Sequence, residues 1–271
     1  MLCFAAGVPV AGAAPAEARF VSLDGTPLKA WVFLPVTAPR GTVIALHGCG
    51  GLYATRGERK GLLNARHQAM ADLLVARGYA VVLPDSLTSR GVAQLCTQKM
   101  NTRTITQTER RRDTLATLNW VARQDWAQGS KMALMGWSHG GSAVLAATDG
   151  HHAEVAAQTA RVALAVAFYP GCSAARKALY QPNTRLVMLL GANDDWTPPE
   201  PCVALGETVG AEVHVYPDSY HDFDNPAGTV TLRRDVPNGI NPGQGVHAGP
   251  NPQAREQAYA RVLELLRIAL D

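Results

Sequence analysis

The chain has 271 residues, of which 47% are hydrophobic and 17% are charged, and its formal net charge is +3. This is the composition of a soluble globular protein with enough chain for a large core, and so small a charge gives no indication of nucleic-acid binding. The one run of like charges, Arg110 to Arg112, lies on a predicted helix and is expected to form a solvated face, with a phosphate site as the alternative.

The N-terminal segment differs from the rest of the chain. Residues 1–18 are apolar, rich in small residues and free of charge before Glu17. They resemble the back half of a secretory leader without its basic start, and they are too short for a membrane span. We therefore expect a leader remnant or a disordered terminus at 1–18, a single domain over 19–271, and a periplasmic or secreted protein. If the segment is not a leader, the expected location is the cytoplasm.

Strands and helices alternate along the chain. A hairpin is predicted over residues 20–35 around an Asp-Gly turn, and buried strands are predicted over 41–48, 80–85, 131–138, 162–171, 185–194 and 211–218. Helices are predicted over 64–78, 109–128, 140–149, 199–210 and 253–270. This order predicts an α/β protein with a mostly parallel, doubly wound sheet and helices on both faces. Residues 225–252 show neither period, so they are expected to be a mobile loop or a functional flap.

The segment GWSHG, residues 136–140, holds the candidate nucleophile. It follows a predicted strand and precedes a predicted helix, which is the context that the G-x-S-x-G pattern needs. The sharp turn strains the backbone of Ser138, so the residues two positions on either side must be small. The hydroxyl is then presented at a helix N-terminus, where developing negative charge is favoured. The alternative is a structural serine in a glycine-rich turn.

A serine hydroxyl needs a base, and the base needs an acid that orients it. In this kind of sheet the expected chain order is serine, acid, histidine, each just after a strand. His221 follows the last predicted strand and is the candidate base, with a surface histidine as the alternative. Asp194 and Asp195 both follow the strand before it, and only one of them can serve easily; the other would be a solvated or helix-capping carboxylate.

Two backbone N–H groups are needed for an oxyanion hole. One is expected from His139, directly after the nucleophile, and the other from the glycine-rich turn at residues 47–51. Cys49 is the candidate donor in that turn, with Gly50 as the alternative. His47 stands just before the loop and is expected to brace it by hydrogen bonds.

The remaining histidines do not indicate a metal site. His214 lies within a predicted strand as a packing residue, and His151 and His152 form a surface pair. No Cys, His and Asp cluster has the spacing of zinc ligands, so we expect neither metal nor cofactor. Cys3 lies in the segment that resembles a leader, and without it four cysteines remain. They suggest two disulfides with three possible connectivities in an exported chain, or four thiols in a cytosolic enzyme.

These motifs resemble the α/β-hydrolase fold and, within it, the dienelactone hydrolase family. The resemblance runs from about residue 28 to the end and is carried by HGCGG, LPDSLTSRG, GWSHGG, FYPGC, GANDDWTPPEPC and YHDFD. It implies Asp194 as the acid, since the family's aspartate stands three positions after the glycine that closes its strand. It also implies that Cys49 pairs with Cys96 and Cys172 with Cys202, because they follow neighbouring strands.

The chain departs from the family pattern at two points. Dienelactone hydrolase itself uses a cysteine nucleophile and a glutamate in the oxyanion loop, where this chain has Ser138 and Gly48. The name of the family therefore does not fix the substrate. Arg90, near the edge where the family holds a carboxylate, is expected to pair with Asp85 instead.

The expected function is hydrolysis of small carboxylic esters through an acyl-enzyme, with a small-molecule ester as partner and neither nucleic acid nor stable membrane insertion. Two alternatives are a serine peptidase of the prolyl-oligopeptidase type and a catalytically silent binding protein with the same fold. Four aromatic residues near the candidate site could line an apolar acyl pocket or belong to the core: Tyr53, Trp137, Trp196 and Phe223.

Overall fold

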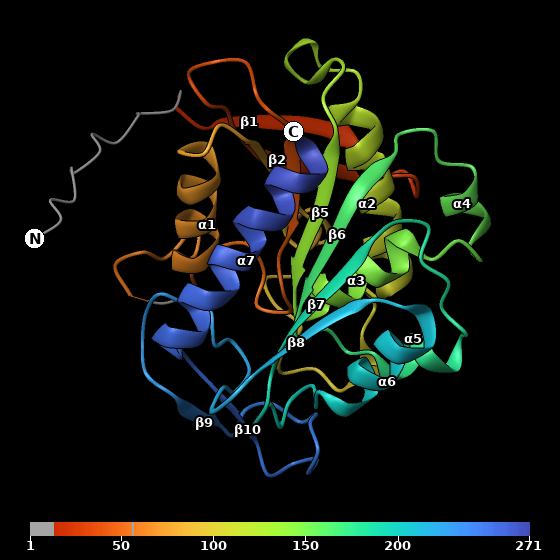
Figure 1. The fold of residues 1–271 in the computed structure, drawn as a ribbon. Coiled ribbons are helices and arrows are strands. Elements are labelled where there is room, and N and C mark those ends of the chain that lie inside the picture. Colours follow the sequence, from red (N-terminus) through yellow and green to blue (C-terminus); the bar gives the residue numbers. More distant parts are fainter. Residues whose placement is uncertain (1–13, 56) are drawn as a thin grey trace, which may run out of the picture.

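A computed structural model describes residues 14–55 and 57–271, and its centre is an eight-stranded sheet (Figure 1). The strand order is β1-β2-β4-β3-β5-β6-β7-β8. The first three neighbours pair in antiparallel fashion, and β4 to β8 form a parallel sheet through β3. The prediction of an α/β-hydrolase architecture with a mostly parallel sheet is confirmed.

The strands lie close to their predicted positions. Their bounds are β1 Ala16–Val21, β2 Pro27–Phe33, β3 Thr42–Leu46, β4 Ala80–Asp85, β5 Met132–Trp137, β6 Val162–Phe168, β7 Leu186–Gly191 and β8 Glu212–Tyr216. Every residue of β3, β4, β5 and β7 is buried, which explains why these strands read as continuous apolar runs. β1 starts at Ala16, inside the segment that was expected to be a leader remnant or disordered, because it pairs with β2 from Ala16 to Val21. Residues 1–13 of that segment lie outside the described residues.

Helices cover both faces of the sheet (Figure 1). The longer ones are α1 Ala65–Val75, α2 Gln107–Val121, α3 His139–Thr148, α6 Glu200–Val209 and α7 Pro252–Leu270, and two short ones, α4 Ala153–Ala156 and α5 Ser173–Lys177, were not predicted. The core cluster on one face includes residues of α1 and α7, and that on the other includes residues of α2, α3 and α6. These two clusters hold the sheet between two apolar layers.

One sequence-based expectation about helix α2 is wrong. Arg110 has no exposed surface and Arg111 is only 8% exposed, although both were expected on a solvated face. Helix α2 packs closely on α3, and Arg110 in its first turn faces inward to the end of β3. Only Arg112 keeps a substantial part of its side chain in solvent.

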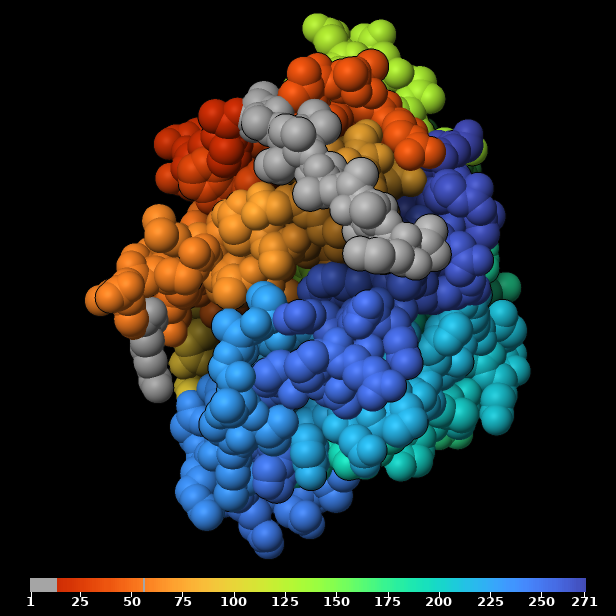
Figure 2. Space-filling model, turned by 60° about the vertical axis from the view of Figure 1, so that its left-hand side comes forward, coloured from red at the N-terminus to blue at the C-terminus, as the bar shows by residue number. Residues whose placement is uncertain are grey.

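The segment 225–252 contains structure that its sequence did not reveal. β9 Thr231–Arg233 pairs with β10 Val246–Ala248 in a separate two-stranded sheet. Strands of three residues are too short to show a period of two, so the pattern gave no signal. We call residues 225–252 the flap; in Figure 2 they lie on the surface in light and mid blue.

Candidate active site

Ser138 occupies a strained turn between β5 and α3. Its backbone φ of 55° and ψ of −117° lie in a region that residues with a side chain rarely adopt. The N–H of Ser138 donates to the carbonyl of Phe168, at 2.9 Å, and so ties the turn to the end of β6. A Cβ on Gly136 would overlap the Gly140 carbonyl, and a Cβ on Gly140 would overlap the Leu46 carbonyl, so both glycines are required sterically. These are the close backbone contacts that the G-x-S-x-G pattern requires of a strand-turn-helix connection.

Asp194 and His221 are brought together from the loops after β7 and β8. The Nδ1 atom of His221 lies 2.8 Å from the Oδ2 atom of Asp194, and both side chains are about 1% exposed. The other carboxylate oxygen of Asp194 accepts the backbone N–H groups of Trp196, at 2.9 Å, and Thr197, at 2.8 Å. The carboxylate is therefore held in one orientation and can hold the imidazole in turn.

The second ring nitrogen of His221, Nε2, is buried and has no hydrogen-bond partner among the described residues. Two rings fix the imidazole plane: Tyr169, with centroids 4.5 Å apart, and Trp196, with centroids 4.6 Å apart. Tyr169 directly follows Phe168, whose carbonyl holds the N–H of Ser138. The loops after β5, β6 and β8 thus meet at one edge of the sheet, and a nitrogen without a partner there is available for proton transfer.

Asp195 points elsewhere and anchors the flap. Its carboxylate accepts the backbone N–H of His247, at 2.8 Å, and lies 2.7 Å from the Nδ1 atom of that residue. Its carbonyl accepts the N–H of Ile240, at 2.9 Å. The two adjacent aspartates therefore divide two tasks, and only Asp194 contacts His221.

Hydrogen bonds hold the flap to the segment that carries His221 and to the loop after β4. The N–H of Gly249 donates to the backbone carbonyl of His221, at 2.8 Å, so β10 directly supports the histidine. On the other side, the side chain of Asn238 donates to the carbonyl of Gln98, at 2.9 Å, and accepts the N–H of Met100, at 3.1 Å. Of the two alternatives that the sequence left open, these bonds favour an ordered flap at the site.

The turn at residues 47–51 lies against Ser138. A Cβ on Gly48 would stand 3.5 Å from the Cβ of Ser138. The carbonyl of Gly48 accepts from the N–H of Gly51, at 3.2 Å, and lies 2.8 Å from the Nδ1 atom of His47. Because the peptide group is planar and trans, fixing this carbonyl also fixes the direction of the Cys49 N–H. His47 braces the turn, and burial, reinforced by the charge of Arg110, holds its pKa well below the usual value.

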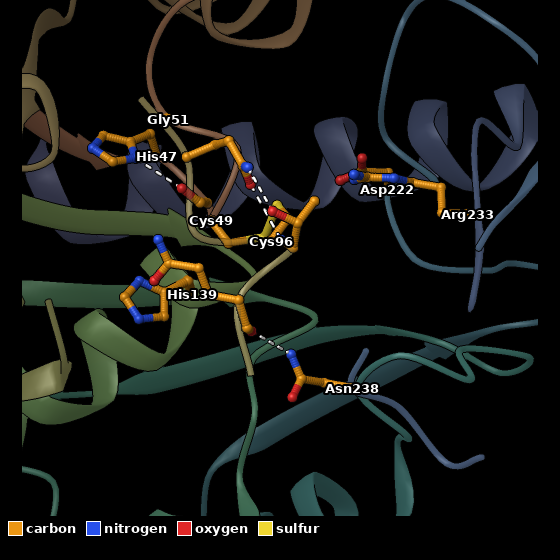
Figure 3. The surroundings of a disulfide bond; sticks show 12 residues. His47, Cys49, Gly51, Cys96, His139, Asp222, Arg233 and Asn238 are labelled. Atoms are coloured by element: carbon orange, nitrogen blue, oxygen red, sulfur yellow. Dashed lines mark hydrogen bonds between the residues drawn. A yellow bond between two sulfur atoms is a disulfide. The ribbon is translucent and has the colours of Figure 1, made fainter. Parts of the chain in front are cut away.

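Two disulfides join the loops that carry these groups, and they are the two that the resemblance implies. Cys49 is bonded to Cys96, and Cys172 to Cys202. The carbonyl of Cys49 also accepts the N–H of Leu95, at 2.7 Å, so the turn at 47–51 is held to the loop after β4 in two ways. In Figure 3 the disulfide lies between His47 and His139 on one side and Arg233 on the other.

Residues 28–270 match the Dienelactone hydrolase family. The chain belongs to this family. The expected family is therefore confirmed, and membership supports a hydrolase. Among curated proteins, none matches the chain by sequence.

Solved structures share the fold of this family member at low identity. A dienelactone hydrolase-like promiscuous phosphotriesterase from metagenomic libraries is 20% identical, with a TM-score of 0.66 over 95% of this chain and 100% of the other. A dienelactone hydrolase from Anabaena variabilis is 17% identical, with a TM-score of 0.63 over 95% and 99%. An acylaminoacyl peptidase from Pyrococcus horikoshii is 13% identical, with a TM-score of 0.63 over 94% of this chain and 41% of its own.

A cleft of about 630 Å³ opens beside the Cys49–Cys96 disulfide. Its walls come from the 47–55 segment, the loop after β4 and the flap, and the residues that line it are Gly50, Thr55, Gln94, Cys96, Thr97 and Thr231 to Asp235. The guanidinium of Arg233 lies 5.3 Å from the ring centroid of Trp196, which in turn packs on His221. Arg233 of the cleft wall thus contacts a ring that packs on the candidate base, while neither Ser138 nor His221 lines the cleft itself.

The aromatic residues considered for an apolar pocket separate into two groups. Trp137 and Phe223 have no exposed surface and belong to the core. Tyr53 is half-buried and its hydroxyl accepts from the indole of Trp31, at 3.3 Å. Only Trp196 contacts a candidate catalytic side chain.

A buried charge network under His221 was missed by sequence reasoning. Arg66 of α1 donates to Asp222, at 2.6 Å, and to the hydroxyl of Tyr169, at 2.8 Å, and that hydroxyl donates to Asp224, at 2.5 Å. Burial opposes the ionisation of Asp222, but Arg66 outweighs it and lowers the pKa of this carboxyl to about 2. Acidic residues after the histidine were visible in YHDFD, but their partner lies far away in the sequence.

Arg90 has other partners than the one expected from the sequence. Its guanidinium donates to Asp113, at 2.8 and 2.9 Å, and to Asp24, at 2.7 Å, and not to Asp85. The carboxylate of Asp85 instead accepts the N–H groups of Leu87, at 3.1 Å, and Thr88, at 3.0 Å, which begin the loop after β4. Local capping satisfies Asp85, so Arg90 reaches the hairpin turn and helix α2.

Among the residues that the structure describes, no three or more His, Cys, Asp or Glu side chains are grouped so that they could hold a metal ion. None of the described helices has the length and apolar run that a membrane crossing requires. The two disulfides are compatible with an extracellular or periplasmic location.

The Cys49–Cys96 disulfide leads to a prediction with an internal control. Replacing both residues by serine is expected to lower the turnover of an ester at least about tenfold, because the proposed Cys49 donor loses the covalent one of its two links to the loop after β4. A closed loop of 47 residues also predicts a loss of about 4 kcal/mol in the free energy of unfolding. Steady-state kinetics and urea unfolding measure the two effects.

The matched control is the double serine variant of Cys172 and Cys202, whose sequence separation of 30 predicts a loss of about 4 kcal/mol as well. It should lose stability with a smaller change in turnover, since neither cysteine belongs to the turn at 47–51. Equal losses of turnover in the two variants would contradict a specific role for Cys49–Cys96.

Proposed function

We propose that the protein is a serine hydrolase that cleaves carboxylic esters of small molecules through an acyl-enzyme. The observation that carries the proposal is the 2.8 Å contact between His221 and Asp194, with the Nε2 atom of His221 left without a partner at the edge where Ser138 is strained. Family membership and hydrolase structures with the same fold support it.

The proposed mechanism begins with proton transfer from Ser138 to His221. The Oγ atom of Ser138 attacks the ester carbonyl carbon while Nε2 of His221 accepts its proton. Asp194 accepts a hydrogen bond from Nδ1–H, which keeps the imidazole in the required tautomer and stabilises its cation. The oxyanion is held by the N–H groups of His139 and Cys49.

The second half of the reaction uses the same groups. The tetrahedral intermediate collapses, and His221 gives its proton to the leaving alcohol. A water molecule then loses a proton to His221 and attacks the acyl-enzyme, and Ser138 regains its proton when the acid leaves. No cofactor or metal is required by this sequence of steps. We further propose a periplasmic or secreted protein that acts on a free small molecule.

Trapping of the acyl-enzyme tests the proposal directly. The protein is mixed with a p-nitrophenyl ester of a short acid, quenched in acid during turnover, and digested for mass spectrometry. We expect the acyl group on the peptide that contains Ser138, together with a burst of p-nitrophenol. Acylation elsewhere, or turnover without it, would contradict the proposed nucleophile.

A peptide p-nitroanilide assayed beside the ester separates the alternatives. Cleavage of the amide at a rate comparable to that of the ester would favour a peptidase, a function found among structures with the same fold. Absence of turnover on both, with ligand binding retained, would favour a silent binding protein.

A further inference from the structure

Arg110 is a buried cation that the mechanism above does not use. Its side chain has no exposed surface, and its Nε atom is buried without a partner in the described part of the chain. No carboxylate lies within ion-pair distance among the described residues, although Arg111 and Arg112 beside it both pair with Glu154. A buried charge without a direct counter-ion is costly, and the structure must supply a reason to keep it.

The position of Arg110 in its helix adds to this cost. It stands in the first turn of α2, where the helix dipole disfavours a positive charge. Burial and the charge of Arg90 lower its pKa to about 10, against the attraction of Asp113 and Asp85, so the side chain stays charged at neutral pH. A stabilising contribution to folding therefore does not explain the residue.

The contacts of Arg110 lie on both sides of the proposed oxyanion hole. Its Nη2 atom donates to the carbonyl of His47, at 2.8 Å, in the strand end that leads to Cys49. Its Nη1 atom lies 3.5 Å from the Nδ1 atom of His47 and 3.5 Å from the Nδ1 atom of His139. The guanidinium of Arg110 thus contacts His47, in the turn that carries the proposed Cys49 donor, and His139, whose own N–H is the other proposed donor.

His47 and His139 can lie beside this cation because both are neutral. The Nε2 atom of His47 accepts the N–H of Ser86, at 3.3 Å, so its Nδ1–H donates to the Gly48 carbonyl and adds no positive charge. Burial, followed by the charge of Arg110, holds the pKa of His139 well below its usual value, as it does for His47. A Cβ on Gly140 would also overlap the carbonyls of Leu46 and His47, so α3 and the end of β3 are in direct contact here. The guanidinium of Arg110 contacts both segments at this point, through the His47 carbonyl and the His139 ring.

We propose that Arg110 is a positioning residue of the oxyanion hole. It holds together the turn at residues 47–51 and the start of α3, which carry the two proposed N–H donors, and it places a positive charge behind them. Negative charge develops in front of the N–H groups of His139 and Cys49 during acyl transfer. A fixed cation in a buried region favours that charge without any reorganisation. This role rests on the proposed function, since it needs an oxyanion.

Kinetics and inhibitor binding together test the inference. The variants are Arg110→Met, which removes the charge, Arg110→Lys, which keeps it, and Arg111→Met as a control on the same helix. We expect Arg110→Met to lower kcat for p-nitrophenyl acetate at least about tenfold with KM little changed. Arg111→Met should stay within about twofold of the wild type.

The second readout is the affinity for phenylboronic acid, measured by calorimetry. Boronic acids form a tetrahedral anion on a serine and so resemble the charged intermediate. We expect Arg110→Met to weaken this affinity by about the same factor as kcat, and Arg110→Lys to recover part of it. Unchanged boronate affinity in Arg110→Met overturns the inference. So does an equal loss in Arg110→Lys, because a brace without an electrostatic effect would give that result.

Two controls keep the outcome decisive. If Arg110→Met does not fold, Arg110→Gln replaces it, and the inference requires Arg110→Lys to bind the boronate more tightly than Arg110→Gln. Boronate binding needs no turnover, so it decides the role of Arg110 even if no ester is hydrolysed and the proposed function fails. A wild-type protein that does not bind the boronate has no oxyanion hole of this kind, which also overturns the inference.

Discussion

Replacing Ser138 by alanine is expected to lower kcat for a short-chain p-nitrophenyl ester by about 10⁴-fold or more. Without the Oγ atom no acyl-enzyme can form, and the N–H groups near the site can only assist attack by water. The substitution removes one atom from an 8% exposed side chain, so the fold should be retained. Steady-state kinetics on protein with an unchanged melting temperature measure the effect.

Ser142 provides the matched control for this variant. It lies one helical turn further along α3, and its hydroxyl donates to the Ser138 carbonyl, at 3.3 Å, and accepts the N–H of Gly171, at 2.9 Å. Ser142→Ala is expected to remain within a few-fold of the wild type. Equal activity of the wild type and Ser138→Ala would mean that Ser138 is not the nucleophile.

The largest contrast between neighbouring residues is expected at the two aspartates after β7. Asp194→Asn should lower kcat by about 10⁴-fold, because an amide opposite Nδ1 favours the wrong tautomer of His221 and cannot stabilise its cation. Asp195→Asn, an identical change one residue later, should cost only a few-fold. It weakens the contact with His247 that anchors the flap and leaves the 2.8 Å contact of Asp194 with His221 in place.

The quantity to measure is the ratio of kcat in Asp195→Asn to kcat in Asp194→Asn, on the same ester and at the same pH. Both variants replace a carboxylate by an amide, so a general electrostatic effect would lower kcat to a similar degree in both. A larger loss in Asp195→Asn than in Asp194→Asn would reverse the assignment of the acid. A rise in KM that is specific to Asp195→Asn would indicate that the flap contributes to substrate binding.

The sequence was most informative where one local rule acts alone. Buried parallel strands read as apolar runs, so the positions of β3 to β8 and the order of the loops after them were predictable. The pattern at residues 136–140 was specific because its two glycines meet backbone carbonyls that no side chain can displace. Between Asp194 and Asp195 the residues alone did not decide, and the resemblance to the family favoured the one that contacts His221.

Features that join distant segments were not predictable in this way. The flap carries β9 and β10 because pairs such as His247 with Leu232 form across a long connection. Arg66 was not associated with Asp222 and Asp224, and Arg90 was assigned the wrong partner. In each case many side chains of suitable charge exist, and only the packing of helices on the sheet selects which of them meet.

The sequence by itself determined the family, the sheet and the order of the candidate catalytic residues, because these depend on local patterns and on the direction of parallel strands. The tertiary structure decided which aspartate contacts His221, that the flap is fastened to the backbone of that histidine, and that Arg110 is buried between His47 and His139. A run of three arginines gives no sign of this last feature. The helix phase and the close packing of α2 on α3 turn the first of them inward and leave the third in solvent.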